Sequence, residues 1–147
     1  MNNVVHLNYS TKKKDDLNLK LVHQGQIQNL DENIINLIKR GLSYQPTHSV
    51  TDVLADLLIG KCQLWLATNN KKIDGVVITV INDFPQSTSC LIWLCAGNNS
   101  KKYIYLIKKI EDWAKEQGCQ TISLEGRLGW KKLLRDYQDK IFMEKVL

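Results

Sequence analysis

The residues with the clearest chemical potential in this sequence lie where a predicted strand runs into a helix. The apolar run Ser89–Cys95 continues through a short loop into Ser100, Lys101 and Lys102, which begin an amphipathic helix. A helix that starts directly after a strand presents unpaired backbone N–H groups, which attract anions. Gly97 with Ser100 and the two lysines is therefore a candidate anion cradle. The alternative interpretation is an ordinary turn before a capped helix.

Glu125, which follows a short predicted strand, is the first candidate for a general base, ahead of Asp83 and His48. Such a carboxylate could take a proton from a reacting group. The structural alternative is a salt bridge from Glu125 to Arg127 or to a nearby lysine.

Several tryptophans could shape a substrate pocket, although tryptophans on strands and at helix starts are more often part of the core. The candidates are Trp93, Trp65 and Trp130. The histidines have no metal-ligand spacing, so no metal site is expected: His6, His23 and His48.

The cysteines lack CxxC spacing and are expected to be buried, reduced thiols. They are Cys62, Cys90, Cys95 and Cys119. Cys90 and Cys95 lie an odd number of positions apart on one predicted strand, so we expect them to point to opposite faces and not to share a metal.

Hydrophobic periodicity predicts the elements that must position these residues. Strands are expected at 17–22, 62–67, 73–81, 89–95, 121–124 and 141–147, with a turn at 68–72. Helices are expected at 31–42, between Ser49 and Gly60, at 101–117 and at 130–137. The expected N-caps are Asp31, Ser49 or Thr51, and Ser100, and the expected helix stops are Gly41, Gly60 and Gly118. This order predicts one α/β domain with a mixed, mostly antiparallel central sheet and helices on both faces.

The bulk properties agree with a globular domain. The chain has 147 residues, 44% of them hydrophobic and 24% charged, and residues 1–16 are polar enough to form a loose arm. No apolar run is long enough to span a bilayer and no secretory signal is recognisable, so a cytoplasmic location is expected. The net charge of +5 is dispersed, which makes nucleic-acid binding only a third choice of function.

The second half of the chain resembles the GCN5-related N-acetyltransferases, and in particular the small acetyltransferase-like proteins of bacteriophages. The similar segments are 64–67, 75–79, 110–118 and 125–137, with a G-R-x-G-W signature at Gly126–Trp130. The resemblance implies acetyl-CoA as cofactor and contacts to it from Leu94, Ala96, Gly97, Asn99, Ser100, Lys101 and Lys102. It also implies a substrate pocket formed by Trp93, Arg127 and Trp130, with Glu125 as the catalytic base.

The sequence departs from that family at two places. The family's glycine-rich motif Q/R-x-x-G-x-G/A falls on Asn98, Asn99, Lys101 and Tyr103. The tyrosine that many members use to protonate the leaving thiolate falls on Leu134, and Tyr137 lies nearly opposite on the expected helix.

Two main functions remain open at this point. The first is a phage-type N-acetyltransferase that transfers an acetyl group from acetyl-CoA to an amine on a small molecule or protein. The alternative is a catalytically inactive binding or assembly module with the same fold, either virion-associated or directed at a host protein. The oligomeric state is not predicted.

Overall fold

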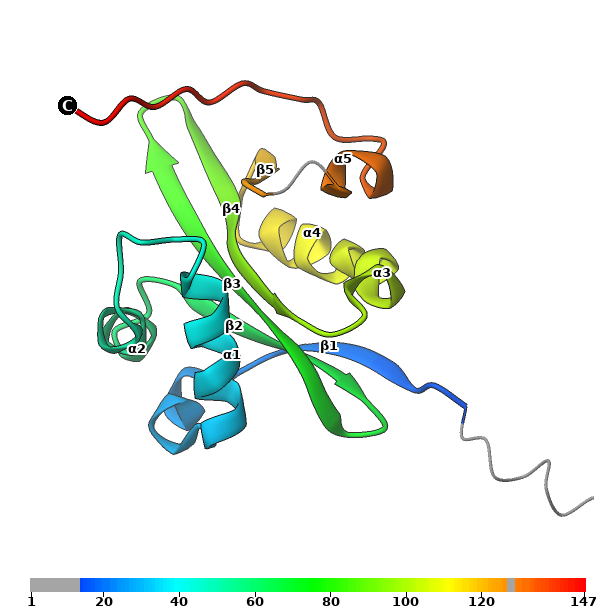
Figure 1. Cartoon of the computed structure of the whole chain (residues 1–147). Coiled ribbons are helices and arrows are strands. Elements are labelled where there is room, and N and C mark those ends of the chain that lie inside the picture. Colours follow the sequence, from blue (N-terminus) through cyan, green and yellow to red (C-terminus); the bar gives the residue numbers. More distant parts are fainter. Residues whose placement is uncertain (1–13, 127–128) are drawn as a thin grey trace, which may run out of the picture.

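A five-stranded mixed sheet with helices on both faces forms the framework of the molecule (Figure 1). The computed structural model describes residues 14–126 and 129–147. The strands lie in chain order, and every neighbouring pair is antiparallel except β4 and β5, which are parallel. They are β1 Leu17–Leu21, β2 Gln63–Asn69, β3 Lys72–Phe84, β4 Ser87–Gly97 and β5 Thr121–Leu124. The predicted fold class is confirmed.

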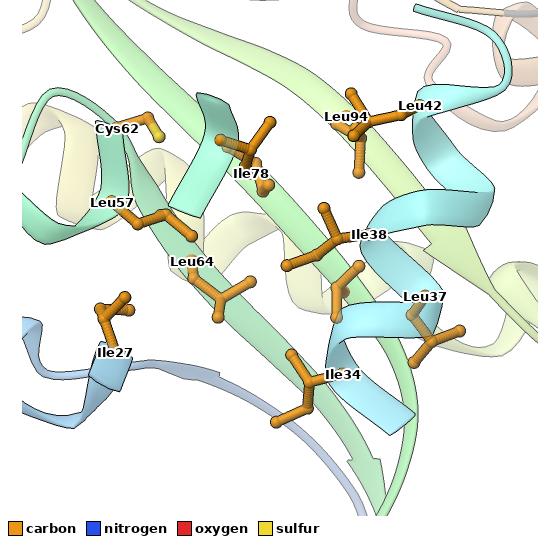
Figure 2. Close-up of a cluster of buried hydrophobic side chains, with 12 residues drawn as sticks. Ile27, Ile34, Leu37, Ile38, Leu42, Leu57, Cys62, Leu64, Ile78 and Leu94 are labelled. Carbon is orange, nitrogen blue, oxygen red and sulfur yellow. The ribbon is translucent and has the colours of Figure 1, made fainter. Parts of the chain in front are cut away.

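Two apolar clusters, one on each face, hold the helices against the sheet. Helices α1 and α2 contribute to the first cluster, which we call the α1/α2 face, and α4 contributes to the second, the α4 face. Figure 2 shows Ile38 of α1 pointing towards Ile78 and Leu94 of the sheet. The helical elements are η2 Gln24–Asn29, α1 Glu32–Leu42, α2 Val50–Leu58, α3 Ser100–Tyr103, η3 Ile104–Leu106, α4 Ile107–Glu116 and α5 Gly129–Leu133. No helix in the described ranges is long and apolar enough to cross a membrane.

Several predicted helix ends are confirmed. The Asp31 side chain accepts a hydrogen bond of 2.9 Å from the Ile34 N–H, and Ser49 forms a capping box with Asp52. Gly60 and Gly118 follow their helices with φ angles of +77° and +87°. Glycine adopts this left-handed conformation without a Cβ clash, which explains why both helices stop there.

Two other predicted ends are wrong. Helix α1 continues through Gly41, which is buried where the helix crosses β4. A Cβ at position 41 would lie 2.5 Å from Leu94 Cδ2, so this glycine permits close packing and does not stop the helix. Ser100 is a helical residue and not a cap, because the N-cap position belongs to Asn99, whose side chain makes no capping hydrogen bond.

The elements after β4 differ most from the prediction. The expected helix at 101–117 is divided into α3, the 3₁₀ turn η3 and α4. The expected helix at 130–137 ends at Leu133, and the expected strand at 141–147 is absent: these residues are exposed and form no regular element. A strand needs a neighbour for its backbone groups, and no described segment pairs with 141–147.

The inner end of the expected N-terminal arm lies against the β2–β3 turn. The Asn70 N–H donates to the Asp16 carbonyl over 3.0 Å, and its side-chain amide donates to the Lys14 carbonyl over 3.1 Å. Residues 1–13 of the arm lie outside the described residues.

Candidate functional site

The candidate site lies where β4 and β5 stop pairing. The parallel register runs from Ser89 opposite Thr121 to Ile92 opposite Leu124. Strand β4 then continues to Gly97, while the chain leaves the sheet after Leu124. The part of β4 beyond Ile92 therefore has β3 on one side and no described strand on the other. The Trp93 and Gly97 carbonyls accept side-chain hydrogen bonds from Gln45 and Arg40, and the other backbone groups on the open side could bind a ligand.

A β-bulge at Trp93 marks the start of this open edge. In the β3–β4 register Ile78 faces Leu94 and Thr79 faces Ile92, which leaves Trp93 as the extra residue. As a result both Trp93 and Leu94 pack on the α1/α2 face. A bulge shifts the side-chain alternation by one position and is frequent beside active sites.

The bulge also corrects the expectation for the thiols. Cys90 and Cys95 both pack on the α4 face, not on opposite faces, because the extra residue lies between them. Burial raises the pKa of both thiols to about 12. All four cysteines are free thiols, as expected, with Cys62 and Cys90 buried and Cys95 and Cys119 partly exposed. Among the described residues no cluster of three or more His, Cys, Asp or Glu side chains could hold a metal.

Trp93 belongs to the α1/α2 face. Its ring is half-buried and meets the His48 ring edge-on at 4.8 Å between centroids. Its carbonyl accepts a 3.3 Å hydrogen bond from the Gln45 side chain. His48, one of the other base candidates, is thus held by Trp93 and by a 2.8 Å contact with Thr47 Oγ1. Leu94 is buried beneath Gly41, so only its backbone could face a ligand.

The loop between β4 and α3 presents free backbone donors. Asn99 is left-handed, with φ 56° and ψ 41°. No acceptor in the described parts of the chain takes a hydrogen bond from the N–H groups of Asn99, Ser100 or Lys101. These donors lie just beyond the open edge of β4, at the position where the sequence predicts an anion site.

Arg40 of α1 holds the other side of this loop. Its Nη2 donates to the Gly97 carbonyl over 2.6 Å, and Nη1 lies 3.4 Å from Asn98 Oδ1. Arg40 therefore places a guanidinium charge beside the loop. The sequence gives no signal for this residue, because Arg40 lies 57 positions before Gly97 and no motif connects the two.

The lysine pair divides between two roles. Lys102 forms an ion pair of 3.1 Å with Asp15, at the inner end of the N-terminal arm. Hydrogen bonds from Asn69 and then from Lys102 lower the pKa of Asp15. Lys101 is exposed and has no acidic partner in the described ranges, so it is the lysine that remains available to a ligand.

The Tyr103 side chain packs against the cluster on the α4 face of the sheet. Its hydroxyl donates a 2.6 Å hydrogen bond to Asp74, the extra residue of a second bulge where β3 meets β2. Burial and this carboxylate raise the pKa of Tyr103. Two of the four side chains at the family's glycine-motif positions, Asn98 and Tyr103, are thus engaged by Arg40 and Asp74. Asp74 is a second residue that sequence analysis missed.

Glu125 follows β5 directly and is exposed. Leu124 pairs with Ile92, so the next residue, Glu125, lies at about the level of the Trp93 bulge. It follows the point where β5 stops pairing with β4. No described residue forms a hydrogen bond or ion pair with its carboxylate. Trp130 of α5 packs over Gly126, where a Cβ would lie 2.8 Å from the indole ring. Arg127 lies outside the described residues.

Two cavities of about 320 and 560 Å³ open elsewhere, beside Val22 and His23 on the β1 side of the sheet. None of their lining residues comes from β4 or from the loop after it, so they are not part of the site at the open strand edge.

Several solved structures with a similar fold are named acetyltransferases. A predicted acetyltransferase from Clostridium acetobutylicum, solved with acetyl-CoA, has a TM-score of 0.65 and 14% identity, and the match covers 90% of this chain and 96% of that one. The aminoglycoside N-acetyltransferase AAC(6')-Iy in complex with CoA has a TM-score of 0.62 and 14% identity, with 90% and 97% covered. A ribosomal-protein-alanine N-acetyltransferase from Brucella melitensis has a TM-score of 0.64 and 12% identity, with 90% and 98% covered.

The chain has the GCN5-related acetyltransferase fold. No family model matches the sequence, and no curated protein is similar to it. At these identities the likeness establishes the shape and leaves the activity to be argued from the site.

The residue that the sequence resemblance aligns with the family's proton donor is buried. Leu134 is 7% exposed and belongs to the core. The Tyr137 hydroxyl donates a 2.7 Å hydrogen bond to Glu111 of α4, and burial together with that carboxylate raises its pKa. A phenol that is already bound to a carboxylate is a poor donor to a leaving thiolate. Neither residue therefore supplies the acid that many acetyltransferases use.

Proposed function

We propose that this protein binds acetyl-CoA along the open edge of β4 and transfers the acetyl group to a primary amine. The observation that carries the proposal is the end of β4–β5 pairing at Ile92. The next five residues of β4 have no described strand on that side, and the N–H groups at the helix start that follows have no acceptor among the described residues. The fold of the matched acetyltransferases, two of them solved with acetyl-CoA or CoA, supports it.

The described residues fit such a ligand. Backbone groups of Leu94 and Ala96 would bind the extended arm of acetyl-CoA, and the loop from Gly97 to Lys101 would bind its pyrophosphate. The αL conformation of Asn99 leaves the N–H groups free, and Asn98 and Tyr103 are held by other residues. The chain lacks the family's glycine motif, whose backbone N–H groups approach the phosphates closely. Here Lys101 and the guanidinium of Arg40 would supply positive charge for the pyrophosphate instead.

When bound, acetyl-CoA supplies the thioester that is split in the reaction. Backbone N–H groups at the Trp93 bulge would polarise the thioester carbonyl. Glu125, which is exposed, would take the proton from the ammonium group of the acceptor, and Trp130 would line the acceptor side. Because Leu134 and Tyr137 supply no proton, the thiolate would be protonated by water.

The acceptor is proposed as a primary amine on a small molecule or a protein, in keeping with the aminoglycoside and ribosomal-protein substrates in the names of two matched structures. The G-R-x-G-W signature at Gly126–Trp130 supports assignment to the phage type.

Titration calorimetry with acetyl-CoA and CoA, at low and moderate salt, tests the binding step. Wild type is expected to bind with a micromolar dissociation constant. Lys101→Ala is expected to weaken binding about tenfold, since one lysine–phosphate contact is worth about 1.5 kcal/mol. Lys115→Ala is the matched control, because Lys115 is an exposed lysine near the other end of the same helical segment and should leave affinity unchanged. Equal acetyl-CoA affinities of the two variants would show that Lys101 does not contact the ligand.

The catalytic step is tested with Glu125→Gln, which keeps the size of the side chain and removes its negative charge. Acetyl-CoA affinity should be unchanged, while the transfer rate to an amine acceptor should fall and lose its dependence on a titrating carboxylate. An unchanged rate would show that Glu125 is not the base.

The second candidate is a binding module that has the acetyltransferase fold and no catalysis. The burial of Leu134 and the Tyr137–Glu111 hydrogen bond favour it, since both remove the usual proton donor. Failure to bind acetyl-CoA at millimolar concentration would favour this candidate and would move the search to protein partners, including those of a virion or host cell. Nucleic-acid binding would remain third.

A further inference from the structure

Lysines that are dispersed in the sequence gather at one end of the sheet. In the β2–β3 turn, the Asn70 side chain donates to the Lys14 carbonyl over 3.1 Å, and the Asn69 side chain donates to Asp15 over 3.0 Å. Asp15 in turn pairs with Lys102 of α3. The inner end of the arm, the turn and the start of the helical segment therefore lie together, at the same end of the molecule (Figure 1).

Six exposed lysines belong to this end, and we call them the lysine surface: Lys14, Lys71, Lys72, Lys101, Lys102 and Lys109. Lys109 of α4 joins the others because its ammonium group donates to Asn18 of β1. Three acidic side chains lie at this end, Asp15, Asp16 and Asp74, whereas Asp112 further along α4 is paired with Lys108. Six lysines against three aspartates leave a net charge of +3 here, more than half of the +5 of the whole chain. Such a local excess attracts an anionic partner.

Contacts within the chain use little of this positive charge. Asp15 is bound to Lys102, and Asp74 accepts the hydrogen bond of the Tyr103 hydroxyl. No described acidic side chain forms an ion pair with the other lysines of the turn and the helix start, which are Lys71, Lys72 and Lys101. Their ammonium groups are therefore available to a ligand that carries several negative charges.

An exposed aromatic ring lies among these lysines. Tyr105 is 62% exposed, and it is the one large apolar side chain exposed in the described segment 100–116. It stands between two lysine pairs, 101–102 and 108–109. Proteins that bind single-stranded nucleic acid combine lysines for the phosphates with aromatic rings on which bases stack. An acidic protein partner would need an apolar centre of contact, which a surface with one exposed ring does not provide.

We propose that the lysine surface and Tyr105 bind single-stranded nucleic acid. The surface contains lysines and no arginine, so its contacts are to phosphates as point charges and do not read base edges. One base would stack on the Tyr105 ring, which is possible for any base. Binding is therefore independent of sequence. It does not require acetyl-CoA, and it would accompany either of the two main candidate functions.

Fluorescence anisotropy with a labelled oligothymidine of about 12 nucleotides tests the proposal. Wild type is expected to bind at low salt with a dissociation constant of about 1–100 μM. The logarithm of the binding constant should fall with the logarithm of the salt concentration with a slope of about −3, which corresponds to about four neutralised phosphates of a single strand. The absence of binding at low salt would overturn the proposal.

Two charge reversals locate the binding surface. Lys72→Glu should weaken oligothymidine binding about tenfold at low salt, because a phosphate contact becomes a repulsion. Lys61→Glu makes the same change of charge at an exposed position before β2, at the end of that strand opposite to the β2–β3 turn, and should leave the affinity within about twofold of wild type. Equal losses in the two variants would show attraction by net charge alone and would overturn the proposal.

Tyr105 separates a nucleic acid from other polyanions. Tyr105→Ala should weaken oligothymidine binding about tenfold, and Tyr105→Phe should bind like wild type because the ring is kept. Wild-type affinity of Tyr105→Ala would contradict base stacking. Polyglutamate should displace the oligothymidine only when its charge is in large excess. Displacement at equal charge would overturn the proposal in favour of an acidic protein segment.

Discussion

Replacement of Gly97 by alanine separates two reasons for a glycine at the end of β4. Gly97 lies opposite Gly75 of β3. A Cβ at position 97 would lie 2.6 Å from the Asp74 carbonyl oxygen and 2.7 Å from Gly75 Cα. Both atoms belong to the backbone, so no side chain can move aside. The strands would have to separate by about 0.8 Å to reach an ordinary contact of 3.4 Å.

The expected cost follows from this geometry. Overpacking in a well-packed region typically costs about 1–3 kcal/mol. Separation of the strands would also weaken the 3.0 Å hydrogen bond from the Asn98 N–H to the Asp74 carbonyl, at about 1 kcal/mol. We therefore expect Gly97→Ala to lower the free energy of unfolding by about 2–4 kcal/mol.

Urea denaturation measures this loss as a fall in the midpoint at constant slope. Gly129→Ala is the control, because a Cβ at the start of α5 meets nothing within 4 Å. It should be neutral or stabilising by up to about 1 kcal/mol. If Gly97→Ala kept wild-type stability and instead weakened acetyl-CoA binding, Gly97 would serve the phosphate and our account of strand packing would be refuted.

Two further predictions concern the Tyr137 hydroxyl and the thiols of Cys62 and Cys90. Tyr137→Phe should lower the free energy of unfolding by about 1–2 kcal/mol through loss of the hydrogen bond to Glu111; Tyr105→Phe, at a 62% exposed position, is the control, and equal stability of the two variants would contradict the role of this bond. The free energy of unfolding should also fall as the pH rises from about 9 towards 12, because burial raises the pKa of Cys62 and Cys90 to about 12 and the unfolded chain loses these protons first. Urea unfolding at several pH values in this range gives the free energy of unfolding as a function of pH. In a variant with both cysteines changed to alanine this free energy should fall less steeply with pH, and an equally steep fall would show that other groups cause it.

Local signals in the sequence were sufficient for much of the fold. Asp31 and Ser49 start helices because their side chains accept hydrogen bonds from the first turn, and Gly60 and Gly118 end helices because they can adopt positive φ. The apolar stripe from Tyr103 to Ala114 packs on the sheet as its spacing predicts. These features depend on residues within one or two turns of each other, so a sequence records them directly.

The position of the loop proposed as an anion site could be predicted in the same way, since it depends on the order of strand, loop and helix. The side chains that surround this loop could not be predicted from the sequence. Arg40 reaches Gly97 from α1, Asp74 holds Tyr103, and Lys102 is paired with Asp15. Each of these contacts joins residues far apart in the chain, and no local pattern specifies which of them meet.

The sequence by itself determined the order of the strands as far as β5, several of the helix ends and the place where a strand opens into a helix. Only the tertiary structure decided on which face of the sheet a side chain lies and which distant residues contact each other. The bulge at Trp93 arises from the register between β3 and β4, and it moves Cys95 to the face of Cys90 against the alternation of the sequence. In the same way, Ile141–Leu147 has the composition of a strand, but a strand exists only where another backbone accepts its hydrogen bonds, and within one described chain none does.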